Sequence, residues 1–186
     1  MKNSISVLAI DDGSFKPKSR GKTVLIGVVF RIDGRIDGIL KEDVGIDALD
    51  STKQIIKMCN KSKFKDQIKY ILLDGIAVAG FNVVDVETLF KKTGKPVINV
   101  FRKMPRLNLI EVALNNFKDK PKRLSLIKKA EDIYSFKNIF FQCHGITPNK
   151  AKILLKKTIF YSGLPEPIRI AHLIASAVTT GESTRP

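Results

Sequence analysis

Short apolar runs that end at turn residues dominate the first half of the chain. The run Ser4–Asp11 stays apolar until it reaches Asp11-Asp12-Gly13, and Thr23–Phe30 is rich in β-branched residues. Both features are typical of buried strands. Asp33-Gly34 is a hairpin signal leading into another strand. Applied along the whole chain, this reasoning predicts strands at Ser4–Asp11, Thr23–Phe30, Arg35–Leu40, Lys69–Leu73, Pro96–Phe101 and Asn138–Cys143.

Helical periodicity appears first between the third and fourth strands and dominates after the fifth. Leu49, Ile55, Ile56 and Cys59 recur at the spacing of an amphipathic helix. Helices are predicted near Ala48–Asn60, Val84–Lys92, Arg106–Phe117, Lys122–Tyr134, Pro148–Phe160 and Pro167–Thr179. We expect the tail, Thr179–Pro186, to be loose.

The order of these elements indicates an α/β fold. An antiparallel meander of three strands, followed by strands linked through helices, is the RNase H-like layout. We expect a mixed sheet of five to six strands flanked by helices, with the fourth strand beside the first. The length of 186 residues suits a single domain over residues 1–186.

Charge changes the picture, because 33 Lys and Arg against 18 Asp and Glu give a formal net charge of +15. Such a field attracts polyanions, which favours a nucleic-acid partner, although a lysine-rich surface kept for solubility would look the same. No run approaches the roughly 18 apolar residues of a membrane span, so we expect no membrane partner. The first residues are too short and polar for a signal peptide, so we expect a cytoplasmic protein.

Two predicted strands end alike, one in Asp11-Asp12-Gly13 and the other in Asp74-Gly75. If these strands are parallel neighbours, about 4.8 Å apart, Asp11 and Asp74 share one end of the sheet. Two carboxylates that close repel each other unless a proton or cation neutralises them. Mg²⁺ or Mn²⁺ would do so and could activate water for phosphodiester cleavage. Taken singly, each pair could also be an ordinary Asp-Gly turn.

A third acid could come from Asp47 or Asp50, at the head of the intervening helix, where either could instead cap that helix. Asp12 should point to the opposite face from Asp11. Asp85 fits best as a helix N-terminal acid. His172 shares one face of the last helix with other polar residues, and this stripe is either solvated or borders a cleft.

The motifs around these acids resemble endonuclease V. Asp11 closing the first strand and Tyr70–Ala77 around Asp74-Gly75 are similar to the metal-ligand strands of that family. Arg102, after Pro96–Phe101, takes the place of a Lys near the family's active site. The resemblance therefore implies an endonuclease V-like fold and Mg²⁺ or Mn²⁺ bound by the two Asp residues.

A closer resemblance is to the archaeal domain-of-unknown-function 99 family, an uncharacterised protein family related to endonuclease V. It rests on Ile10–Gly13, Leu73–Gly75, Ala79–Asn82, Glu166–Ser176 and Gly181–Ser183. Compared with endonuclease V, the chain lacks Tyr and Pro in Ile39–Leu49, where that family carries a Pro-Tyr-x-Pro wedge. It also has Asp47 or Asp50 instead of a helix-head Glu, and no His in Ile76–Asp85.

These observations favour a metal-dependent endonuclease-like protein acting on DNA or RNA, with a possible role in repair. The alternatives are a nucleic-acid-binding protein with the same fold but little or no cleavage, and a small-molecule enzyme on this scaffold. The candidate catalytic residues are Asp11, Asp74, Asp47, Asp50 and Arg102, with Asp11, Asp74 and Asp47 as metal ligands. The candidate nucleic-acid contacts are Lys16, Lys18, Arg20, Asn82, Arg102, Lys103 and Arg106. The sequence leaves open a monomer or a dimer.

Overall fold

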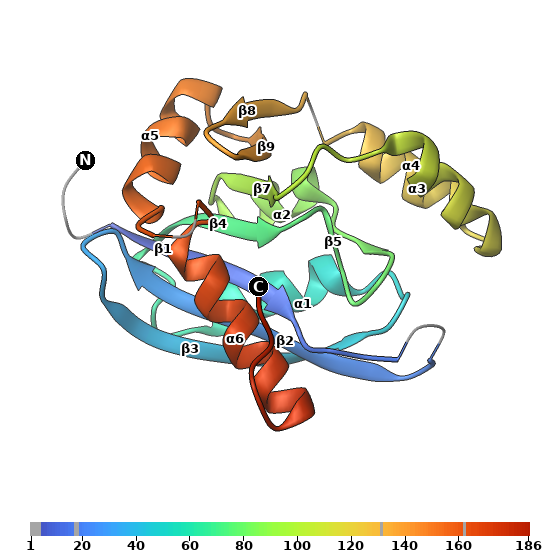
Figure 1. Cartoon of the computed structure of the whole chain (residues 1–186), viewed down its shortest axis with the longest axis horizontal. Helices are drawn as coiled ribbons and strands as arrows, with labels where there is room; N and C mark the ends of the chain where they lie inside the picture. The colour runs from blue at the N-terminus through green and yellow to red at the C-terminus, as the bar shows by residue number, and fades with distance from the viewer. Residues whose placement is uncertain (1–4, 17–18, 131, 162) are drawn as a thin grey trace.

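A seven-stranded mixed sheet forms the centre of the computed structural model, which describes residues 5–16, 19–130, 132–161 and 163–186 (Figure 1). The strand order is β3-β2-β1-β4-β7-β9-β8. The strands are β1 (Ser6–Asp12), β2 (Lys22–Arg31), β3 (Ile36–Gly45), β4 (Ile68–Asp74), β7 (Val97–Phe101), β8 (Tyr134–Phe136) and β9 (Ile139–His144). β5 (Ala77–Val78) and β6 (Asn82–Val83) form a separate short hairpin. β4 runs parallel to both β1 and β7, and the other neighbouring pairs are antiparallel.

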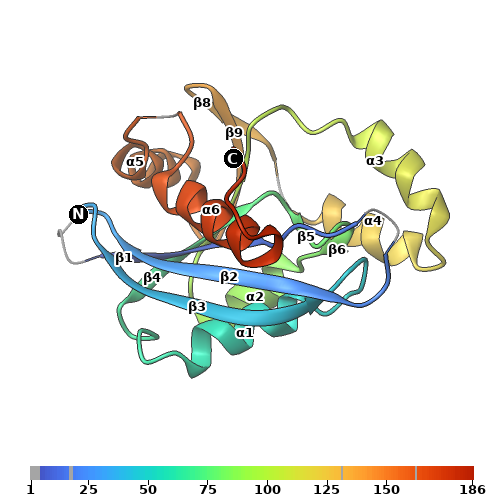
Figure 2. The same ribbon diagram turned by 60° about the horizontal axis from the view of Figure 1, so that its bottom comes forward.

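Helices cover both faces of this sheet. They are α1 (Ser51–Lys61), α2 (Val86–Thr93), α3 (Leu107–Ala113), α4 (Lys120–Lys128), α5 (Pro148–Thr158) and α6 (Glu166–Thr180), with a 3-10 turn at Leu114–Asn116. Figure 2 shows α6 on one side of β1 and β2, and α1 and α2 on the other. α3 and α4 stand at the end of the molecule away from α5 in both views. Among the described ranges, no helix combines the length and apolar character needed to cross a membrane.

Alternation along the strands decides which face each acidic side chain joins. Val7 and Ala9 of β1 belong to the apolar cluster beneath α5 and α6, whereas Leu8 and Ile10 belong to the cluster on the α1 and α2 side. Because side chains alternate with period two, Asp11 continues the α6 face and Asp12 the opposite face. In β4, Leu72 faces the α6 cluster, so Asp74 follows it to the same side as Asp11.

The predicted fold class is confirmed, and β1 and β4 are parallel neighbours as expected. The sheet has seven strands rather than five or six, because Tyr134–Phe136 is a strand instead of the end of a helix. Tyr134 packs on Phe141 with ring centroids 5.6 Å apart, and burial of such rings favours the sheet edge over a longer helix. β3 extends to Gly45, well beyond the predicted Leu40, because it pairs with β2 as far as Lys22.

The tail is less loose than expected. The backbone N–H of Thr184 donates to Oγ of Ser176 at 3.1 Å, and Oγ1 of Thr184 lies 3.2 Å from Nε2 of His172. The end of the chain therefore folds back onto α6. Two predicted residues lie outside the described residues. They are Ser4, the predicted start of the first strand, and Lys18, a candidate nucleic-acid contact.

Candidate metal and nucleic-acid site

Asp11 and Asp74 meet at the carboxyl ends of β1 and β4. The last paired residues of the two strands are Ile10 and Leu73, so the acids that follow occupy equivalent positions at the sheet edge. Asp11 is buried, and Asp74 is partly exposed. Parallel pairing combined with alternation therefore brings the two carboxylates to one place, as the sequence led us to expect.

The third member of the group is His172, on α6. One ligand atom from each of Asp11, Asp74 and His172 lies within 4.8 Å of the other two. Nδ1 of His172 is 2.8 Å from Oδ2 of Asp11. Two carboxylates and an imidazole form a donor set suited to a divalent cation such as Mn²⁺ or Mg²⁺. Among the described residues, these three could hold a metal ion.

Arg102 pairs with the second carboxylate. It follows β7, the strand next to β4, and its Nη2 donates to Oδ2 of Asp74 at 2.8 Å. The Arg102 side chain is 41% exposed, so one side of the guanidinium faces solvent beside the acids. A planar guanidinium that is held by a carboxylate and still exposed can also donate to a phosphate oxygen.

Burial and mutual repulsion make the acids at this edge weaker. Burial, then the charge of Asp11, raise the pKa of Asp74 to about 6, while Arg102 and His172 oppose the shift. Burial also raises the pKa of Asp12 to about 7, with Asp11 and Asp74 contributing and a hydrogen bond from the Ala79 backbone opposing. The hydrogen bond with Asp11 raises the pKa of His172. This edge therefore favours extra positive charge, whether from protons or from a cation.

Asp47 and Asp50, the acids considered for a third ligand, are not members of this cluster. Oδ1 of Asp47 accepts the Phe81 backbone N–H at 2.8 Å. Asp50 accepts the Gly45 N–H at 3.1 Å and the side-chain amide of Asn82 at 2.7 Å. These bonds hold the β3–α1 turn to the β5–β6 hairpin and occupy both carboxylates.

Asn82, a candidate nucleic-acid contact, lies in the interior of the protein and not on its surface. It is fully buried, donates to Gly45 O at 2.8 Å and accepts the Ser51 N–H at 3.0 Å, so it is a structural residue. The basic candidates fit a surface role better. Among the described residues of that set, the exposed ones are Lys16, Arg20, Arg102, Lys103 and Arg106.

A cavity of about 490 Å³ lies on the other face of the same sheet edge. It is lined by Phe15, Asp47, Gly80, Phe81, Ala113, Asn116 and Phe117. Phe15 comes from the segment after β1, and Gly80 comes from the hairpin after β4. Two residues that line the cavity therefore follow the same two strands that carry Asp11 and Asp74. Phe81 packs against the apolar core, whereas Phe15 is half-buried at this cavity.

Arg123 fixes one wall of this cavity. It is 3% exposed, and its guanidinium donates to the carbonyls of Asp47, Ala48 and Phe81. The Arg123 guanidinium also lies 4.5 Å from the Phe117 ring centroid, a stacking arrangement that favours a cation. The sequence gives no sign of this role, because a single Arg in a basic run carries no signal of burial.

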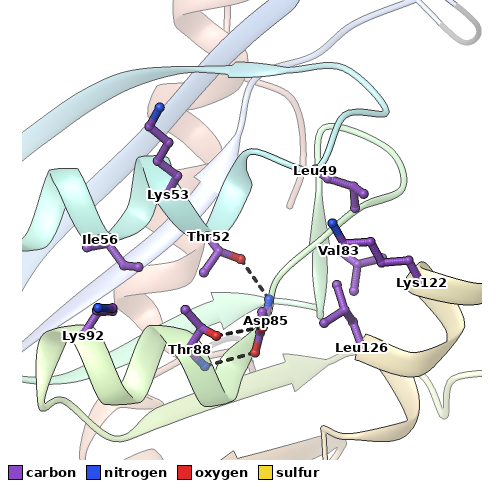
Figure 3. A pocket seen from close by; sticks show the side chains of 10 residues that line it. All are labelled: Leu49, Thr52, Lys53, Ile56, Val83, Asp85, Thr88, Lys92, Lys122 and Leu126. Carbon is purple, nitrogen blue, oxygen red and sulfur yellow. Dashed lines mark hydrogen bonds between the residues drawn. The ribbon is translucent and has the colours of Figure 1, made fainter. Parts of the chain in front are cut away.

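A second hollow, of about 420 Å³, lies between α1, α2 and α4 (Figure 3). Asp85 caps α2 there by accepting the Thr88 N–H at 3.0 Å, which confirms its predicted place at a helix start. The Asp85 N–H donates to Thr52 at 2.9 Å. These polar groups satisfy one another, and the hollow contains none of the predicted site residues.

The sequence pattern did not identify His172 as part of the acidic cluster. It could place His172 on the polar stripe of the last helix, but not above β1 and β4. α6 buries Ile168, Ala171 and Ala175 against the sheet, and this packing puts His172 at the edge of the buried face, next to Asp11.

Comparisons with known proteins identify the family of this chain. A family model described as endonuclease dU matches residues 3–179. A UPF0215 protein of Methanopyrus kandleri is 40% identical over 99% of this chain and 96% of its own length. The crystal structure of a protein of unknown function from Archaeoglobus fulgidus has a TM-score of 0.88 at 36% identity, covering 95% of this chain and 99% of its own.

A more distant likeness confirms the fold. Endonuclease V of Ciona intestinalis, solved in complex with a 23mer DNA containing an inosine followed by a ribo-adenosine, has a TM-score of 0.59 at 14% identity. The match covers 89% of this chain and 81% of that one. The predicted endonuclease V-like architecture is therefore correct.

Proposed function

The chain belongs to the endonuclease dU family, and from this premise we propose that it is a divalent-metal-dependent endonuclease that cleaves DNA at deoxyuridine. The observation that carries the proposal is the juxtaposition of Asp11, Asp74 and His172 at the end of two parallel strands. The net charge of +15 supports a nucleic-acid substrate. A nuclease that acts where cytosine has been deaminated would serve in DNA repair.

Asp11 and Asp74 would hold the cation, Mg²⁺ or Mn²⁺. When bound, such an ion activates a water molecule and neutralises charge on the leaving oxygen. His172 orients the Asp11 carboxylate through the bond to Oδ2. Arg102 neutralises Asp74 and presents its exposed edge to a substrate phosphate. Lys16, Arg20, Lys103 and Arg106 would contact flanking phosphates.

The cavity beside the site supports recognition of an extruded base. Enzymes that act at a single base take it out of the stack and read its Watson–Crick edge in a pocket. Phe15, Phe81 and Phe117 offer aromatic walls, and Asp47 a carboxylate. A carboxylate accepts the N3–H of uracil but repels the N3 lone pair of cytosine. Asp47 would therefore take part in recognition rather than in metal binding.

The test is a nicking assay on matched duplexes that contain deoxyuridine, deoxycytidine or thymidine at one position, with Mg²⁺, with Mn²⁺ or with EDTA. We expect a nick only at deoxyuridine and only with metal. Asp74→Asn should reduce cleavage at least about 100-fold, because it removes a ligand charge. Asp43→Asn, an equal change of charge at an exposed position of β3, is the control. Cleavage that persists in EDTA would refute the proposal.

One observation favours a second candidate, a nucleic-acid-binding protein without cleavage. Arg102 and His172 already pair with Asp74 and Asp11, each at 2.8 Å, so the chain itself supplies cationic partners for both acids. Tight binding of deoxyuridine DNA with no nick, unchanged by metal, would favour this function. The nicking assay, together with a binding measurement on the same duplexes, therefore separates the two functions.

A further inference from the structure

Helix α3 presents an apolar surface to solvent. All of Leu107–Ala113 is described, and the helix contains no buried side chain. Leu107, Leu109 and Val112 are 54%, 52% and 63% exposed, and Met104 just before the helix is 53% exposed. Single exposed apolar residues are ordinary, but a group gathered on one short element marks an interaction surface. Leu109 and Val112 are three residues apart and lie on one side of the helix, whereas Leu107 lies on the side of Ile110. We call Leu109 and Val112 the α3 surface.

The α3 surface rests on an anchored base. Leu114, directly after α3, is fully buried, and Ile110 packs against the apolar cluster beneath. Phe117 contacts Phe81 with ring centroids 5.5 Å apart, and Arg123 lies against the other side of its ring. The helix is therefore held in place while its outer side chains remain free to contact a partner.

Charge decides which partner suits this surface. From Arg102 to Lys122 the chain has six Lys or Arg residues and two acids, Glu111 and Asp119. Asp119 is already paired with Arg123. Two copies of this segment would repel each other, whereas a polyanion would be attracted and would release counterions. A surface that combines apolar side chains with cations matches exposed bases flanked by phosphates.

The position of the segment links the α3 surface to the proposed site. At its start, Arg102 pairs with Asp74 of the metal-ligand group. At its end, Ala113, Asn116 and Phe117 line the cavity that would receive a base. The segment therefore begins at the acids and ends at the cavity, and α3 lies between these two points in the sequence.

From these observations we infer that the α3 surface contacts the unstacked bases of duplex DNA and stabilises the opened helix while one nucleotide is extruded. Lys103 and Arg106 would hold the phosphates on either side. The inference rests on the proposed function and adds the element that opens the duplex. Apolar side chains placed between base steps offset the cost of unstacking.

The experiment compares duplex with single-stranded substrate. In the double variant Leu109→Ser/Val112→Ser, kcat/KM on duplex deoxyuridine DNA should fall about tenfold, because the lost contacts no longer offset unstacking. On a single-stranded deoxyuridine oligonucleotide it should change less than about twofold, because no duplex has to open. Ile153→Ser on α5, at a position 52% exposed, is the matched control and should leave both rates unchanged. Equal losses on both substrates would overturn the inference.

A binding measurement separates this inference from cleavage. 2-Aminopurine placed next to deoxyuridine in a duplex brightens when it unstacks, and the Asp74→Asn background prevents nicking. The Leu109→Ser/Val112→Ser change should reduce this signal by about half or more, even if the parent chain never cleaves DNA. An unchanged signal would overturn the inference. Sedimentation identifies one cause of such a result. If the parent chain is a dimer and the variant is a monomer, the α3 surface joins two copies of the chain instead of contacting DNA.

Discussion

Nδ1 of His172 lies 2.8 Å from Oδ2 of Asp11, although the two residues are 161 positions apart in the chain. The contact joins the last helix to the first strand at the point where Asp74 also arrives. Thr184 approaches Nε2 of the same ring at 3.2 Å. The imidazole is therefore held from both sides, and it fixes the orientation of a carboxylate that we propose as a metal ligand.

Loss of His172 should weaken metal binding through Asp11. We expect His172→Ala to lower Mn²⁺ affinity about 10- to 100-fold, as removal of outer partners of metal ligands does. His172→Gln keeps an N–H donor and should recover part of the loss. Isothermal titration of Mn²⁺ measures both, with Val178→Ala, on an exposed position of the same helix, as control. Equal affinity in His172→Ala and the parent would show that the hydrogen bond has no such role.

The stability of the metal-free protein should fall as pH rises from about 5 to 8. Asp12 and Asp74 have pKa values of about 7 and about 6 in the folded chain, above those of unfolded Asp, so folding favours their protonated forms. His172 has a raised pKa, so its contribution is present at low pH and is also lost as pH rises through that value. All three groups therefore act in the same direction.

Saturating Mn²⁺ should reverse this trend, because metal binding requires deprotonated carboxylates. Thermal melts with and without Mn²⁺ across this pH range test both statements. Asp12→Asn should flatten the metal-free profile and stabilise the protein at pH 8 by on the order of 2 kcal/mol, since it removes a buried charge. A metal-free profile that rises with pH would contradict the assignment of these shifts.

Substitution of Asp47 should change which base is accepted. Asp47 has a positive φ of 54°, which Asn tolerates better than most residues, so Asp47→Asn preserves the turn. Its amide can donate to N3 of cytosine, which a carboxylate cannot do, while its oxygen can still accept the N3–H of uracil. We expect the preference for deoxyuridine over deoxycytidine to fall about 10- to 100-fold. Competition assays measure this ratio, and Asp43→Asn should leave it unchanged.

Removal of Arg123 should destabilise the fold and the cavity together. Its buried guanidinium pairs with Asp119 and donates to three backbone carbonyls. Arg123→Ala should cost about 3 kcal/mol, because these acceptors lose their donor. Arg123→Lys should recover little, since an ammonium cannot reproduce the planar fork. Urea unfolding tests this, with the exposed Lys122→Ala as control. A loss no larger than that of Lys122→Ala would show that the buried network contributes little.

The local sequence pattern predicted the features that follow from strand pairing and from side-chain alternation along a strand. Asp11 and Asp74 each close an apolar run, and parallel pairing carries both to the same rim. The alternation that separates Asp11 from Asp12 is likewise a property of any strand. The pairing of the two acids could therefore be predicted without coordinates.

The third member of the group, His172, could not be predicted in this way. Asp47 and Asp50 lie at the head of the helix where an acid was expected, yet their carboxylates satisfy backbone and amide donors of the β3–α1 turn and the β5–β6 hairpin. Sequence cannot say which of several nearby donors an Asp will meet. That choice depends on how the hairpin packs against the turn.

The sequence by itself determined six of the seven strands of the sheet, most of the helices, the excess of positive charge and the two acids at one sheet edge. These follow from local periodicity and from pairing between strands joined by one helix. Only the tertiary structure decided that His172 completes the group, that Asp47 lines a cavity and that the apolar side of α3 stays exposed. Each of these depends on the docking of elements far apart in the chain, which is governed by side-chain packing and not by any local period.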